Sequence, residues 1–192
     1  MTRFTDAVRA CLEYQNWYGA LALTLTLPDI CAGIEYPSER SSKVRYSQWF
    51  DRYLGATYKN KITVPDLVIE NTFLTGADCY ALRCAYLHQG IDDTEGQPAR
   101  ETLNKFHFTT MQMHRLMAFD MLTLNVRRFC LEFCGAADRW AEERGGDARV
   151  ADELGRLLTI QSGVFSPHPR VQNVQCAPDP ECASRGERPS CN

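Results

Sequence analysis

The sequence predicts a mainly α-helical domain with a small β-hairpin inserted near residues 105–124. Two segments, one at the N-terminus and one over residues 125–144, repeat apolar residues at the spacing of a single helix face. A third, Thr75 to Gly90, begins with a helix-capping residue and ends with glycine. The chain has 192 residues, 44% of them hydrophobic, which is enough for one core. We therefore expect a helical domain over residues 1–165 and a poorly ordered tail over residues 166–192.

The first predicted helix is long and ends at Pro28, because proline interrupts the helical pattern. The apolar run from Tyr18 to Leu27 is about half of the roughly 20 residues that a membrane span needs, so no span is expected. The residues on the apolar face of this helix are Phe4, Val8, Cys11, Tyr18, Leu21 and Leu25.

A second helix is predicted in SSKVRYSQWFDRYL, where Ser41 or Ser42 is the cap and Trp49 and Tyr53 pack inward with Val44. The stretch YKNKITVPDLVIEN follows, and it contains a proline. We expect this stretch to be a connection with a short extended piece or a helical turn.

The helix in TGADCYALRCAYLHQG is bounded by Thr75 as N-cap and Gly90 as stop. The acidic, glycine- and proline-containing stretch IDDTEGQPARE then reads as an exposed loop. KFHFTTMQM and MLTL alternate apolar and polar residues, which predicts a hairpin with its turn near His114.

Asn125 is the expected cap of a strongly amphipathic helix, and RVADELGRLLTIQ is expected to form the last helix of the ordered body. From Ser166 onward, proline, serine, charge and cysteine replace the apolar period, which is typical of a disordered tail. The apolar face of the amphipathic helix contains Val126, Phe129, Cys130, Phe133, Ala137 and Trp140.

A net charge of -3 and a pI near 5.8 give no global attraction to nucleic acid, so RNA binding would depend on a local basic surface. The N-terminal segment carries charges where a secretory signal needs an apolar run, so we expect a cytoplasmic protein. Candidates for a local basic surface, which equally well solvate helix faces, are Lys43, Arg45, Arg52, Lys59, Arg127, Arg128 and Arg139. The tryptophans Trp17, Trp49 and Trp140 are expected as core or interface anchors rather than base-stacking platforms.

Nine cysteines are present, and those inside helical patterns are expected to be core thiols in a reducing compartment: Cys11, Cys79, Cys84 and Cys130. In the tail, His168, Cys176, Cys182 and Cys191 lack the paired short spacing of zinc sites, so we expect no metal and no cofactor. His107 and His114 are expected to be structural.

Arg83 and His88 are the candidate catalytic residues. Five positions on an ideal helix correspond to about 7.5 Å of rise and roughly 140° of rotation, so one helix is not expected to aim both side chains at one point. Two copies of the helix across a twofold axis could gather them into one shared cleft, which favours a homodimer.

The chemistry of the pair suits cleavage of the RNA backbone without a metal. Imidazole transfers protons near neutral pH, and guanidinium binds phosphate oxygens. The expected products are a 2′,3′-cyclic phosphate and a 5′-hydroxyl end. The simpler interpretation is an interface or surface arginine and a histidine that closes a helix end.

The Arg-x4-His spacing in LRCAYLHQG resembles the signature of the HEPN superfamily. This resemblance implies an up-and-down helical bundle that dimerises, with metal-independent endoribonuclease activity used in toxin-antitoxin and antiphage defence. It assigns Arg83 and His88 as the catalytic residues, and it implies an antitoxin or a defence-system protein as partner. Gly90 stands where HEPN toxins paired with a nucleotidyltransferase have a tyrosine, so that subclass is not expected.

Two alternatives remain open. Many HEPN members have asparagine, aspartate or histidine after the motif arginine, and Cys84 occupies this position here. Since a thiol does not make the same hydrogen bonds, the first alternative is a non-catalytic HEPN-like protein that binds RNA, a nucleotide or a protein. The second is a structural interaction domain with the cysteine-rich tail as a tether.

Overall fold

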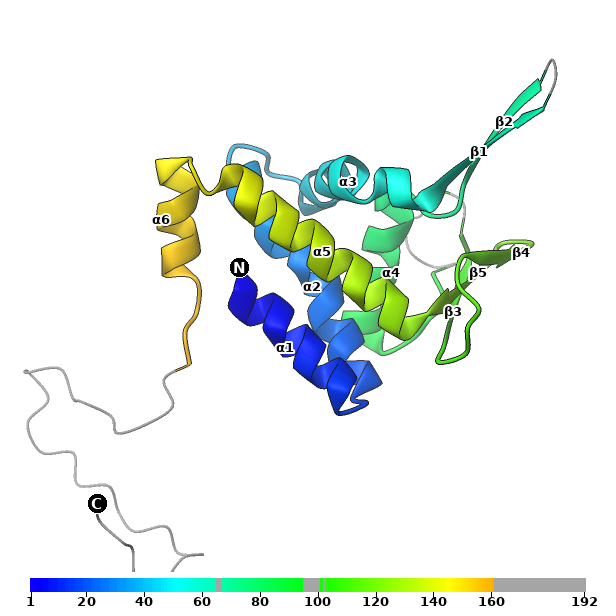
Figure 1. Cartoon of the computed structure of the whole chain (residues 1–192), viewed down its shortest axis with the longest axis horizontal. Helices are drawn as coiled ribbons and strands as arrows, with labels where there is room; N and C mark the ends of the chain where they lie inside the picture. The colour runs from blue at the N-terminus through cyan, green and yellow to red at the C-terminus, as the bar shows by residue number, and fades with distance from the viewer. Residues whose placement is uncertain (65–66, 95–100, 102, 161–192) are drawn as a thin grey trace, which may run out of the picture. The chain divides into compact units, whose positions relative to one another are not determined.

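The computed structural model describes residues 1–64, 67–94, 101 and 103–160 (Figure 1). The chain divides into two compact units, Met1–Leu157 and Leu158–Asn192, and the architecture below is that of the first unit. This unit ends eight residues before the boundary predicted at residue 165. The predicted tail, residues 166–192, lies outside the described residues.

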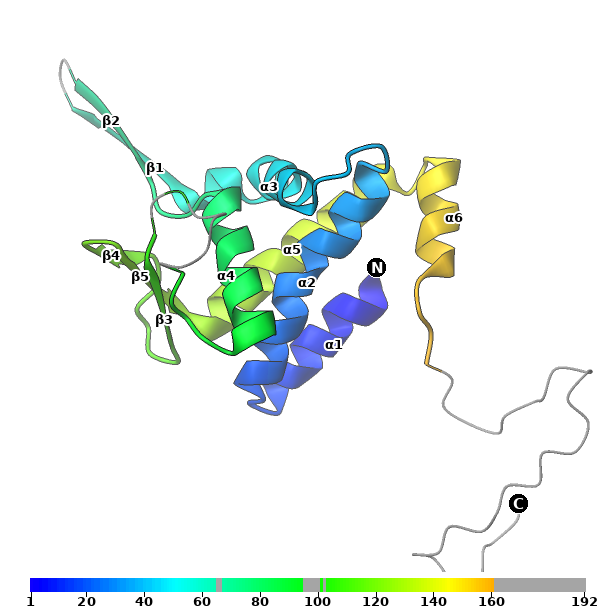
Figure 2. The ribbon, with the colours of Figure 1, turned by 180° about the vertical axis from the view of Figure 1, so that it is seen from behind.

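The first unit is mainly helical, as predicted, and α2 is its central helix. Helix α2 packs against α1, α3 and α5, and it also contacts α4 and α6 (Figures 1 and 2). The six helices of the described residues are α1 (Thr2–Glu13), α2 (Trp17–Glu35), α3 (Ser42–Tyr53), α4 (Gly76–Gln89), α5 (Val126–Arg144) and α6 (Ala148–Arg156), with a 3-10 turn, η1, at Gly55–Tyr58.

The long N-terminal helix predicted from the sequence is two helices, and Pro28 lies inside the second one. The break occurs at Gln15, whose φ of 56° is in the left-handed region. The side chain of Asn16 then caps α2 by accepting a hydrogen bond from the Gly19 N–H at 3.0 Å. Pro28 removes one helical hydrogen bond, but packing on several sides holds α2 together and outweighs this loss.

The segment after α3 contains a hairpin rather than a simple connection. Strands β1 (Lys59–Val64) and β2 (Leu67–Thr72) pair in antiparallel register, with Lys59 opposite Thr72. The expected short extended piece is therefore present, but it is longer than expected, because it consists of two paired strands of six residues each.

The predicted hairpin near residues 105–124 is a three-stranded sheet with the order β3-β5-β4. Strand β3 (Lys105–Thr109) runs parallel to β5 (Met121–Asn125), and β4 (Leu116–Ala118) runs antiparallel to β5. The tight turn therefore lies at Phe119 and Asp120, not near His114. Phe119 has a φ of 56°, a turn conformation that its aromatic side chain did not predict.

The predicted caps are confirmed. Ser41 accepts from the Val44 N–H at 3.3 Å and Asn125 from the Arg128 N–H at 2.9 Å. Thr75 accepts from the Asp78 N–H at 3.1 Å, and Gly90 ends α4 with a φ of 71°.

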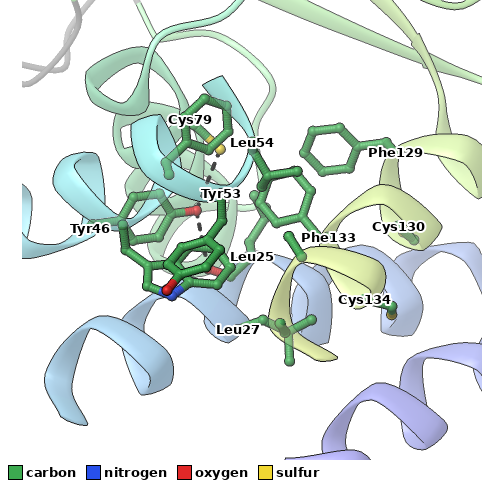
Figure 3. Close-up of a cluster of buried hydrophobic side chains, with 14 of the residues drawn as sticks. Leu25, Leu27, Tyr46, Tyr53, Leu54, Cys79, Phe129, Cys130, Phe133 and Cys134 are labelled. Carbon is green, nitrogen blue, oxygen red and sulfur yellow. Dashed lines mark hydrogen bonds between the residues drawn. The ribbon is translucent and has the colours of Figure 1, made fainter. Parts of the chain in front are cut away.

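The core lies between α2, α3, α4 and α5, and Figure 3 shows part of it. The rings of Phe129 and Phe133 lie 4.5 Å apart, and Phe50 lies 5.9 Å from Phe133. In the same region Tyr46 donates to the Leu25 carbonyl and lies 3.4 Å from the Cys79 sulfur. Aromatic rings of α3 and α5 thus fill much of this core, with Trp49 and Trp140 fully buried, as expected, and Trp17 half-buried.

By length and composition alone, α2 could cross a membrane, and it is the one helix of the described residues that meets this test. Half of its most apolar window is buried inside the protein. A core helix of a soluble protein passes the same test, so α2 is weak evidence for a membrane span.

Candidate functional site

Helix α4 is fixed at its N-terminus by buried polar contacts. The Asp78 carboxylate is fully buried and accepts from the backbone N–H groups of Glu101 at 2.7 Å and Leu103 at 3.3 Å. A Cβ on Gly76 would lie 2.6 Å from the Ser47 Cα, so only glycine allows α3 this close to the start of α4. The candidate residues are therefore carried on a rigidly positioned helix.

Arg83 makes two polar contacts that define the candidate site. Its Nε donates to the Asp29 Oδ2 on α2 at 2.8 Å. Its Nη1 lies 3.2 Å from the His88 Nε2. The Arg83 and Asp29 side chains are 23% and 24% exposed, and His88 is exposed, so the cluster can be reached from solvent.

The structure brings Arg83 and His88 together within one chain, so the expectation that one helix cannot do so was wrong. The rotation between two positions on a helix fixes only the directions of their Cα–Cβ bonds. The arginine side chain is long enough to reach the histidine ring across this angle. Because guanidinium only donates, this contact requires an unprotonated His88 Nε2. A twofold axis is therefore not needed to bring an arginine next to a histidine.

Burial and charge act on both members of the ion pair. Burial raises the pKa of Asp29, and the nearby Arg83 partly opposes this rise. Burial alone would lower the pKa of Arg83, but the charge of Asp29 and its hydrogen bond outweigh this effect and raise the pKa. Arg83 therefore remains cationic and is oriented by Asp29.

No motif in the sequence pointed to Asp29 as part of this site. A carboxylate next to Pro28 in an otherwise apolar helix was the available signal, since buried carboxylates usually have a partner. The guanidinium of Arg83 also lies 5.9 Å from the ring centroid of Tyr80, and Cys84 is half-buried beside it in sequence.

Of the predicted core thiols, Cys79 and Cys130 are buried, whereas Cys11 and Cys84 are half-buried. Burial raises the pKa of both buried thiols to about 12. These two thiols are consequently poor nucleophiles at neutral pH.

His114 is a structural residue, as predicted, because both ring nitrogens are used internally. Its Nδ1 accepts from the Asn125 N–H and its Nε2 lies 3.2 Å from the Glu132 Oε1, so the proton is on Nε2. Glu132 also accepts from the Tyr58 hydroxyl at 2.6 Å and pairs with Arg115. This cluster ties the segment between β3 and β4 to α5.

We expect His114 to make stability depend on pH. Burial lowers the pKa of His114 from 6.5, with Arg115 and Arg128 acting in the same direction and Glu132 opposing them. Between the two pKa values the unfolded chain binds the proton and the folded chain does not. Stability should therefore fall as pH falls below about 6.5, and the loss should stop below the folded-state pKa. Urea unfolding at pH 7.5, 6.5 and 5.5 measures this.

The matched variant is His114→Gln, which removes the titrating group. Its loss of stability between pH 7.5 and 5.5 should be smaller than that of the wild type. The same loss in both proteins would contradict this role of His114.

The basic residues that were candidates for an RNA-binding surface do not form one cluster, and several of them already have partners within the protein. Arg52 pairs with Glu35 at 3.5 Å, while Arg45 and Arg139 donate to the backbone carbonyls of Glu39 and Tyr53. Arg127 and Arg128 are exposed in the first turn of α5.

In residues 1–64, 67–94, 101 and 103–160, no three His, Cys, Asp or Glu side chains are grouped so that they could hold a metal ion. The tail residues His168, Cys176, Cys182 and Cys191 lie outside these ranges.

The fold and the site together define a mainly helical protein with a solvent-accessible Arg-His-Asp cluster on one central helix pair. Comparison of the chain with family models, with curated proteins and with solved structures finds no match in any of the three.

Proposed function

We propose that the protein is a metal-independent endoribonuclease of HEPN type, with His88 and Arg83 as catalytic residues. The observation that carries this proposal is the 3.2 Å contact between the two side chains at a solvent-accessible position. A histidine and a charged arginine this close together can act on the same phosphodiester.

In the proposed reaction, the ribose 2′-oxygen attacks phosphorus, its proton leaves to a base, and the bond to the 5′-oxygen breaks as that oxygen gains a proton. His88 supplies the proton transfer through Nε2, the nitrogen that Arg83 contacts. Arg83 turns from His88 to the phosphate and stabilises the negative charge on its oxygens. Asp29 holds Arg83 through Nε, which leaves N–H groups at the far end of the planar guanidinium to bind the phosphate.

We also propose that the active form is a homodimer. The reaction needs a neutral imidazole to accept one proton and a protonated imidazole to donate another, and each chain has one His88 beside Arg83. A twofold interface at α4 would place two such groups on one substrate. A cytoplasmic role in toxin-antitoxin or antiphage defence, with an antitoxin or defence protein as partner, follows from the HEPN resemblance.

The test is incubation of the purified protein with unstructured RNA in excess EDTA, followed by analysis of the product ends. Cleavage that persists in EDTA and leaves 2′,3′-cyclic phosphate and 5′-hydroxyl ends is the expected result. Cleavage that stops in EDTA would contradict the proposal. Sedimentation of the same sample measures whether the protein is a dimer.

The second candidate is a non-catalytic HEPN-like binding protein. The specific observation in its favour is Cys84, which follows Arg83 and is half-buried. RNA binding without cleavage under all conditions tested would favour this candidate.

A further inference from the structure

A groove separate from the Arg83 side chain lies between the first turns of α2 and α5, the C-terminal end of α4 and the end of β3. It consists of two adjoining cavities of about 520 Å³ and 350 Å³, which share Trp17, Thr110 and Val126. We call it the α2–β3 groove. Both views of the ribbon show the end of α4 beside the start of α2 (Figures 1 and 2).

The walls of the larger cavity are mainly aromatic and apolar. Tyr18 is 79% exposed, Trp17 is half-buried, and the Tyr86 hydroxyl donates to the Tyr18 carbonyl at 3.1 Å. Asp92 also lines this cavity, and its charge disfavours a phosphate there. The cavity volume lies within the range of about 300–1,000 Å³ that is usual for ligand pockets.

The smaller cavity carries positive charge. Arg127 and Arg128 line it and are exposed. Within the described residues their hydrogen bonds go to neutral acceptors, since Arg127 donates to the Leu12 carbonyl at 3.5 Å and Arg128 to the Gln112 Oε1 at 3.3 Å. Arg9 and Arg144, in contrast, pair with carboxylates. Within the part of the chain that the structure describes, neither arginine at this end of the groove therefore forms an ion pair with a carboxylate.

We infer that the α2–β3 groove binds single-stranded RNA, with an unpaired base in the aromatic cavity and the adjoining phosphates at Arg127 and Arg128. Aromatic side chains stack on any unpaired base, and exposed arginines bind the backbone that follows it. The inference rests on the proposed function for its ligand class, and it adds a substrate-binding site outside Arg83 and His88. The groove includes Tyr86 and Gly90, which lie two residues before and two residues after His88. RNA bound in the groove would therefore reach the C-terminal end of α4, which carries His88.

The aromatic character of one cavity and the positive charge of the other favour RNA over a protein partner. A nucleotide has an uncharged base and a charged phosphate, which match an aromatic cavity beside two arginines. An apolar protein segment would fill the larger cavity but would leave Arg127 and Arg128 without an anion.

The experiment measures binding of a fluorescently labelled single-stranded RNA of twelve nucleotides, by anisotropy, with full-length protein carrying His88→Ala so that the probe stays intact. In this background Tyr18→Ala is expected to weaken binding roughly 5- to 100-fold, because one stacking contact is lost. Arg127→Ala and Arg128→Ala should each weaken binding and reduce the slope of log affinity against log salt by about 0.7.

Two exposed residues outside the groove give matched controls. Tyr14→Ala removes a tyrosine that is 86% exposed, and Arg156→Ala removes an arginine whose side chain is 69% exposed. Both controls should bind RNA as the parent does, and a duplex of the same sequence should bind more weakly than the single strand.

The inference is overturned if the groove variants bind RNA like the controls, or if no RNA binds. It is also overturned if Tyr18→Ala changes only the association of the protein with itself, which would make the groove a protein contact. Groove-dependent binding without any cleavage by the wild type would refute the nuclease proposal alone. Cleavage that is unaffected by the groove variants would refute the groove alone.

Discussion

His88→Ala is expected to lower the rate of RNA cleavage by about 10²- to 10⁴-fold, the contribution that a positioned acid or base usually makes. The reason is that Nε2, the nitrogen next to Arg83, is lost, and the reaction then depends on water for proton transfer. The measurement is the single-turnover rate on a labelled RNA with saturating protein, so that weaker binding does not mask the chemical step.

Gln89→Ala is the matched control for this variant. Gln89 is the exposed neighbour of His88 in the last turn of α4. Its replacement should leave the cleavage rate unchanged, and equal rates in wild type and His88→Ala would refute the catalytic role.

Arg83→Lys separates charge from geometry at the same site. Lysine keeps the positive charge but lacks the planar fork that contacts Asp29 and His88 at the same time. We expect a large loss of cleavage rate with the fold intact. Circular dichroism and urea unfolding are needed as controls, because Arg83→Ala would leave Asp29 half-buried without its partner.

Phe133→Ala is expected to lower the free energy of unfolding by about 3–5 kcal/mol. Phe133 is fully buried, and its ring contacts those of Phe129 and Phe50. The variant loses the burial of the ring and leaves a cavity that the surrounding helices cannot fully close. Urea unfolding followed by tryptophan fluorescence measures the difference.

Phe119→Ala provides the same chemical change at an exposed position. Phe119 is fully exposed in the turn between β4 and β5. Its replacement should change the free energy of unfolding by less than about 0.5 kcal/mol. Similar losses for both variants would mean that Phe133 is not part of a packed core.

Local signals in the sequence predicted most of the helices correctly. The caps Ser41, Thr75 and Asn125 and the stop at Gly90 are where they were expected, because a cap depends on residues within one turn of it. The break at Gln15 escaped prediction, since glutamine seldom adopts a left-handed conformation and the apolar period continues across it.

The arrangement of the strands was not accessible from local patterns. Alternation of apolar and polar residues identifies strands but does not say which strands pair. The sequence pattern predicts a turn near His114, whereas the contacts of His114 with Asn125 and Glu132 hold the segment that leads from β3 to β4. These contacts join residues 11 and 18 positions apart.

By itself, the sequence determined which segments are helical, where α3, α4 and α5 start, where α4 ends, and that Arg83 and His88 share one helix. Only the tertiary structure decided that Asp29 from α2 holds Arg83, that Arg83 reaches His88, and that the starts of α2 and α5 enclose a groove. The physical reason is that helix formation depends on neighbours within about four residues, whereas ion pairs and cavities depend on how separate helices pack.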